Sequence, residues 1–133
     1  MKIPSLILKQ LYTFNSLENI EGGVQFTVKN RLSDATFTAL KEVKIDGEGV
    51  PLDSIQLHLS SGTVLLPKDV SSANPIQFKL RETINMVCAI PHLKTGKYKL
   101  EITFTADPFG DLTLDVEDGV SEKDTTRVSI PRD

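Results

Sequence analysis

The sequence contains two histidines, His58 and His92, which are its side chains best suited to acid–base chemistry or metal binding near neutral pH. His58 stands between Leu57 and Leu59, so strand alternation would place it on the face opposite those apolar side chains. There it would serve as a base or ligand only beside a carboxylate. His92 follows Pro91 in a predicted loop. The plainer interpretation of both is a solvated polar residue, and we retain His58 and His92 as candidate ligand or interface residues.

Metal-binding patterns are weak in this sequence. Two histidines cannot form a three-histidine zinc site, and no His-Glu-x-x-His motif is present. A site of two histidines and a carboxylate would need His58 and His92 to converge from separate segments. An acidic run invites a calcium interpretation, but its spacing is not that of an EF-hand, and apolar residues fill alternate positions. We therefore predict no metal site and a solvated, charged strand edge at Asp107, Asp111, Asp115, Glu117 and Asp118.

The potential nucleophiles lack neighbours that would activate them. Cys88 lies in the apolar stretch 84–90 with no cationic residue adjacent, which predicts a buried, unreactive thiol. The serine pairs at 60–61 and 71–72 are typical of turns, and none stands in a Gly-x-Ser-x-Gly motif. The glycines at 22–23 and 47–49 complete no phosphate-binding pattern at the start of a helix. The residues thus predict no catalytic residue and no cofactor.

The elements that must position these residues show period-two alternation along most of the chain. Because successive side chains on a strand point to opposite faces, each alternating run predicts a strand with one buried face and one wet face. The turns between the runs carry glycine, proline, aspartate and serine. These patterns predict an all-β fold, an antiparallel β-sandwich or open barrel of about eight or nine strands. The runs lie at residues 24–28, 43–45, 55–59, 76–80, 98–106, 112–116 and 128–130.

Three segments fit the alternation less well. Residues 4–12 carry apolar residues at helix-like spacing after Pro4, which predicts a short N-terminal helix or an irregular lead-in to a strand. Residues 67–72 would form one helical turn or an extended loop. The polar stretch 117–124 predicts a solvated loop, after which strand spacing resumes at Val128 and Ile130.

Length and charge narrow the classes of function. A chain of 133 residues suits a single domain, residues 1–133, with a self-sufficient core. Its net charge of -3 offers no basic excess for phosphates, so we expect no nucleic-acid partner. No signal peptide or membrane span is visible, so we expect a cytoplasmic location and no membrane partner. The single cysteine rules out an internal disulfide.

Three stretches together resemble a known family. They are residues 11–19 running into 23–30, residues 43–51 followed by Asp53 and Ile55, and the glycine-led alternating stretch 95–102. In this order they resemble the small β subunit of bacterial C-glycoside deglycosidases. The resemblance implies a non-catalytic β-sandwich that packs against a TIM-barrel, metal-dependent partner subunit and helps to shape its site.

The sequence is also similar, more weakly, to short proteins labelled hydroxymethylglutaryl-CoA reductase. The residues argue against that activity, because nicotinamide and acyl-CoA sites need more chain and a phosphate-binding glycine motif. Three hypotheses follow. The chain is a non-catalytic subunit or interaction module, a stand-alone sandwich that binds a sugar or small ligand around His58, or a homo-oligomer joined through edge strands.

Overall fold

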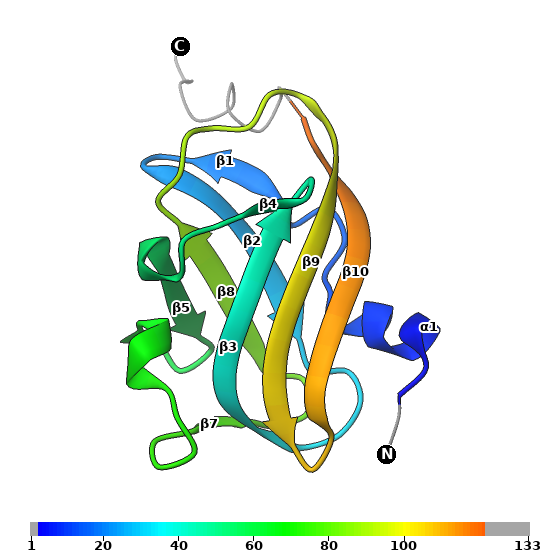
Figure 1. Ribbon diagram of the computed structural model, residues 1–133, viewed down its shortest axis with the longest axis vertical. Helices are drawn as coiled ribbons and strands as arrows, with labels where there is room; N and C mark the ends of the chain where they lie inside the picture. The colour runs from blue at the N-terminus through cyan, green and yellow to red at the C-terminus, as the bar shows by residue number, and fades with distance from the viewer. Residues whose placement is uncertain (1–2, 122–133) are drawn as a thin grey trace.

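Two antiparallel sheets lie face to face in the computed structural model, which describes residues 3–121 (Figure 1). The first sheet has the order β1-β2-β8-β5-β6, and the second has the order β10-β9-β3-β4, with β7 also paired to β3. This arrangement confirms the all-β sandwich, and the described strands do not close into a barrel. The strands are β1 (Glu18–Ile20), β2 (Gly23–Lys29), β3 (Ala35–Ile45), β4 (Glu48–Gly49), β5 (Ile55–Leu59), β6 (Val64–Leu65), β7 (Ile76–Phe78), β8 (Thr83–Cys88), β9 (Gly96–Asp107) and β10 (Gly110–Val120).

The alternating apolar residues form the core between the sheets. In β10 every second side chain from Leu112 to Val120 is buried, and the intervening residues are exposed. Phe37 of β3 stacks on Phe104 of β9, with ring centroids 5.1 Å apart and planes 14° apart. Phe78 of β7 and Phe37 form a T-shaped pair, with ring centroids 6.3 Å apart and planes at 89°. Such aromatic pairs add to the burial of apolar area, so this cluster anchors the second sheet.

A tight turn fixes the register of β3 and β4 at the end of the sandwich that is uppermost in Figure 1. Asp46 and Gly47 both have positive φ, 51° and 83°, as the two-residue turn between β3 and β4 requires. The Asp46 amide donates to the Lys99 carbonyl at 2.8 Å, and the Lys99 amide donates to the Asp46 carboxylate at 2.8 Å. The Asp46–Gly47 turn is therefore tied to β9.

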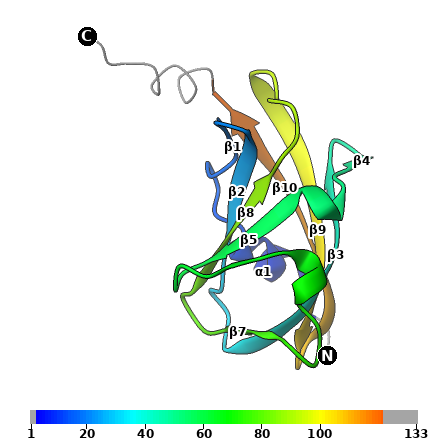
Figure 2. The same ribbon diagram turned by 90° about the vertical axis from the view of Figure 1, so that its left-hand side faces the viewer.

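The N-terminal segment, residues 3–17, covers the free edge of β10. Its α1 helix (Ser5–Leu8) continues into the 3-10 helix η1 (Lys9–Leu11), and both contact β10. Leu8 and Leu11 are buried in the common core, and Tyr12 forms an isolated bridge to Val28 of β2. Figures 1 and 2 show α1 beside β10, where it shields the backbone of an otherwise long edge strand. The predicted short helix is confirmed.

Of the two alternatives for residues 67–72, the structure shows the helical turn, as the 3-10 helix η3 (Pro67–Asp69). A further 3-10 helix, η2 (Leu52–Ser54), precedes β5. Two other expectations were wrong. The run at 76–80 stops at Phe78, because the chain turns at Arg81 (φ 78°) and leaves Leu80 44% exposed. The predicted loop at 117–124 is strand up to Val120, because Glu117–Val120 pair with β9 in unbroken register. The predicted strand at Val128 and Ile130 lies outside the described residues.

Candidate functional site

His58 lies on the outer face of the first sheet. It is half-buried on β5, opposite Asn85 of β8, and its Nε2 atom is 3.1 Å from Oε1 of Gln56 on the same face. Beside it, the Asn85 amide accepts from Thr27 at 3.0 Å and donates to Gln25 at 3.0 Å. The position opposite Leu57 agrees with the alternation, and His58 lies between Asn85 of β8 and the apolar Val64 of β6.

His92 lies at the upper end of the sandwich, in the loop after β8. Its Nε2 atom is 2.7 Å from the Ile20 carbonyl, so the ring donates its proton there and joins this loop to the end of β1. The ring also lines a hollow of about 370 Å³ that Glu48 and Tyr98 share. Within this hollow the Tyr98 hydroxyl donates to the Lys94 carbonyl at 2.6 Å, which leaves the phenol oxygen as an acceptor only.

The structure does not bring the two histidines together. His58 belongs to the outer face of the first sheet, whereas His92 faces a hollow at its upper end. Among residues 3–121, no group of three or more histidine, cysteine, aspartate or glutamate side chains is placed to hold a metal ion. The role of His58 and His92 as ligand or interface residues stays a prediction.

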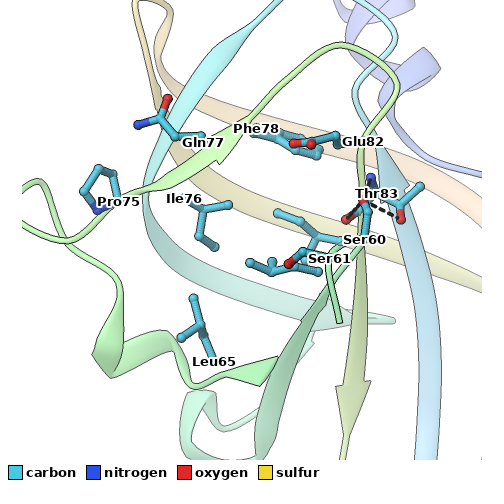
Figure 3. Close-up of a pocket in the computed structure, with 11 residues that line it drawn as sticks. Ser60, Ser61, Leu65, Pro75, Ile76, Gln77, Phe78, Glu82 and Thr83 are labelled. Atoms are coloured by element: carbon cyan, nitrogen blue, oxygen red, sulfur yellow. Dashed lines mark hydrogen bonds between the residues drawn. The ribbon is translucent and has the colours of Figure 1, made fainter. Parts of the chain in front are cut away.

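A second hollow, of about 270 Å³, opens at the other end of the sandwich (Figure 3). Ile76 and Phe78 of β7 form one side, and Ser60 and Thr83 form another. Ser60 is a turn residue, as predicted, and its hydroxyl accepts from the Thr83 amide at 2.8 Å and donates to the Thr83 carbonyl at 3.1 Å. The hydroxyl therefore ties the turn after β5 to the start of the neighbouring strand β8, and its hydrogen bonds do not pair it with a base.

Asp118 is the one buried carboxylate of the described chain, so the prediction that it belongs to a solvated edge was wrong. It is 7% exposed and accepts from the Tyr12 hydroxyl at 2.6 Å, from the Asn15 amide at 3.0 Å and from the Leu17 amide at 3.1 Å. Burial, followed by the hydrogen bond to Asp118, raises the pKa of the Tyr12 phenol far above its ordinary range. The phenol therefore remains a donor, and the pair fastens the N-terminal segment to β10.

The other acidic residues of that run lie on the wet face, as predicted. Asp111, Asp115 and Glu117 are exposed on β10. The Thr105 hydroxyl and the Lys41 ammonium, 2.6 Å and 3.2 Å away, hold the pKa of the Asp111 carboxyl below its usual range. Because both members of the Lys41–Asp111 pair are exposed, it contributes little to stability.

Cys88 is fully buried at the end of β8, the strand that lies between β2 and β5. Burial raises the pKa of its thiol to about 12. We expect the native thiol to react with a disulfide reagent at pH 8 at least about 100-fold more slowly than in concentrated urea, since reaction must await opening of the sheet. Labelling rates followed by mass spectrometry check this.

The same burial predicts a loss of stability in alkali. The unfolded thiol releases its proton above its ordinary pKa of 9.0, whereas the folded thiol holds the proton until about 12. The free energy of unfolding should therefore fall as the pH rises from 9 to 12, and Cys88→Ala should make this fall shallower. Urea titrations at several pH values measure the slope, and an equal slope in the variant would contradict the assignment.

A family model described as "Hydroxymethylglutaryl-CoA reductase, N-terminal domain" matches residues 7–121, from α1 to the end of β10. No curated protein matches the chain. No helix within residues 3–121 is long and apolar enough to cross a membrane. Of the two resemblances seen in the sequence, the match supports the reductase label. Because it spans most of the sandwich, the chain belongs to the family described as the N-terminal domain of hydroxymethylglutaryl-CoA reductase.

Proposed function

We propose that this chain is a non-catalytic β-sandwich module, a single domain that supports a separate enzyme through its N-terminal segment. The observation that carries the proposal is the placement of its exposed apolar side chains. Leu6, Ile7 and Phe14 are 76%, 38% and 51% exposed, and all three lie on the segment that covers β10. The other large exposed apolar residues of the described chain lie elsewhere, Val64 on β6 and Leu80 in the loop between β7 and β8. Apolar side chains gathered on one segment are typical of a protein interface.

The contacts of the carboxylate, thiol, hydroxyl and imidazole groups that could do chemistry also support a structural role for this chain. Asp118 accepts hydrogen bonds that hold the N-terminal segment, and the Cys88 thiol is packed in the core with a raised pKa. The Ser60 hydroxyl closes a turn, and the His92 ring donates to a backbone carbonyl. Each group stabilises the fold through packing or a hydrogen bond, whereas catalysis needs an exposed nucleophile or acid beside a partner of matched pKa.

The family description is consistent with a module that accompanies a catalytic unit, since it names an N-terminal domain. Hydride transfer from a nicotinamide requires groups that hold its phosphates, commonly a glycine-rich loop at the start of a helix. Here α1 has four residues, and each 3-10 helix has three. We therefore place the reductase chemistry suggested by the family name on a partner polypeptide.

Two partner enzymes follow from the sequence. The family description makes the first a reductase catalytic unit. The resemblance to C-glycoside deglycosidase β subunits makes the second a metal-dependent TIM-barrel enzyme of carbohydrate metabolism. With either partner, this chain would be a cytoplasmic subunit, and the substrate site would lie on the other polypeptide.

The experiment is recovery of the partner from the source cell with this chain as bait. We expect a stoichiometric enzyme to co-purify, and we expect the double variant Leu6→Ser with Phe14→Ser to lower its recovery at least about tenfold, because the variant removes apolar anchors. The control is Val64→Ser with Leu80→Ser, which removes two exposed apolar side chains elsewhere. Far-UV circular dichroism verifies the folding of both variants.

Two results would overturn the proposal. One is turnover of hydroxymethylglutaryl-CoA with a nicotinamide cofactor by the purified chain alone. The other is equal recovery of the partner by the N-terminal variant and the control. Recovery of the chain as a self-associated oligomer without an enzyme would favour the homo-oligomer hypothesis. A ligand whose binding is abolished by His58→Ala would favour the stand-alone binding hypothesis.

A further inference from the structure

The edge of β3 that faces away from β9 is paired only at its two ends. β7 pairs with Ala35–Phe37, and β4 pairs with Lys44–Ile45. Between them, Thr38–Glu42 have no strand beside them on this side within the described chain. Alternate residues of an edge strand direct their backbone N–H and C=O groups outward. This gap therefore presents unpaired backbone donors and acceptors, whose alternation is interrupted by the irregularities in the pairing with β9 between Phe37 and Ala39 and between Leu40 and Glu42.

An apolar hollow of about 410 Å³ lies against this gap, and we call it the β3 groove. Leu40 of β3 is buried and belongs to the common core. Leu52 of η2 and the Leu66–Pro67 pair at the start of η3 form the opposite wall, and each is half-buried. A side chain entering the groove would thus reach the core between β3 and the two 3-10 helices.

Two side chains of opposite charge line the β3 groove. Asp53 and Lys68 both line it, and both are exposed. Among residues 3–121 neither belongs to an ion pair, with each other or with another group. A ligand that carries a cation and an anion close to an apolar group would match both charges.

We propose that the β3 groove binds an extended segment of a partner protein, which adds to Thr38–Glu42 as a short strand and inserts one large apolar side chain beside Leu40. A basic residue of the segment would lie near Asp53, and an acidic residue near Lys68. A strand fits better than a lipid, because a hydrocarbon tail would leave the backbone groups of the gap unpaired. The β10 strand of a second copy cannot supply the added strand, because its edge is covered by its own N-terminal segment.

This surface is separate from the one in the proposed function. The N-terminal segment covers the β10 edge of the second sheet, whereas the β3 groove lies at β3, beyond β9. The two proposals can therefore fail independently, and a test of the groove needs no partner enzyme.

The test uses a displayed library of random peptides of about nine residues, long enough to span the gap, selected on the full chain. We expect enrichment of one large apolar residue accompanied by a basic and an acidic residue. Leu66→Glu should weaken binding of the enriched peptide at least about tenfold, whereas Val64→Glu, on an exposed residue outside the groove lining, should leave it unchanged. Lys68→Glu should reverse the charge preference at one position.

Methylation of alternate backbone nitrogens of the enriched peptide gives a test that requires no folded variant. It removes strand hydrogen bonds while keeping the side chains, so we expect at least about tenfold weaker binding. The proposal is overturned if no peptide is enriched, if Leu66→Glu or methylation leaves affinity unchanged, or if a second copy blocks the groove in sedimentation experiments. Should Leu66→Glu fail to fold, Leu66→Gln replaces it.

Discussion

Asp118→Ala is expected to lower the free energy of unfolding by about 4 kcal/mol, because it leaves several buried donors without an acceptor. The carboxylate receives the Tyr12 hydroxyl and the amides of Asn15 and Leu17 in a site that is 7% exposed. A loss of this size is a large part of the stability of a domain of this length. Urea unfolding followed by far-UV circular dichroism measures it, since the protein has no tryptophan.

Conservative variants separate the charge from the packing. Asp118→Asn keeps a carbonyl acceptor of the same shape, so we expect a smaller loss, about 2 kcal/mol. Tyr12→Phe removes one donor and leaves the backbone amides, so its cost should be about 1.5 kcal/mol. Asp115→Ala, an exposed acid on the same strand, should be within about 0.5 kcal/mol of the wild type. Equal effects of Asp118→Ala and Asp115→Ala would refute the structural role of Asp118.

Asp118 also shows where sequence interpretation fails for this fold. The acidic side chains of this run predicted a solvated strand edge, and Asp111, Asp115 and Glu117 are indeed exposed. Asp118, however, shares the buried parity of Leu112 and the apolar positions after it. An acidic residue at a core-facing position was the available signal. Its partners, more than 100 residues away in sequence, were not visible, because only the tertiary fold brings the N-terminal segment to β10.

No predicted run covered β1 or β8, although β8 alternates regularly, and only residues 43–45 of β3 were predicted. For β3 the reason is its irregular pairing. β9 and β10 pair without interruption, so their side chains keep a strict period of two. β3 has irregularities in its pairing with β9 between Phe37 and Ala39 and between Leu40 and Glu42. Each extra residue shifts the alternation, so the buried positions of β3 lie three apart at first and two apart only at the end. Only the regular end, residues 43–45, could be predicted.

Gly23→Ala is expected to cost about 3 kcal/mol or more, because a Cβ atom at this position would stand 2.0 Å from the Cys88 carbonyl oxygen. The neighbouring atom is backbone at the start of the β2–β8 ladder, so no side-chain rotation can relieve the contact. Only separation of the strands would make room. Unfolding in urea should therefore occur at a markedly lower midpoint.

The matched control for this variant is Gly49→Ala, where no atom lies within 4 Å of the added carbon and φ is not positive. We expect it to stay within about 0.5 kcal/mol of the wild type. The double variant Gly23→Ala with Cys88→Ala adds a sharper test. Because the clash is with the backbone oxygen, shortening the Cys88 side chain should bring no rescue. Rescue would locate the conflict at the thiol and would contradict the close approach of β2 to β8. Gly22, with a φ of 88°, shapes the turn, so the two adjacent glycines answer different steric demands.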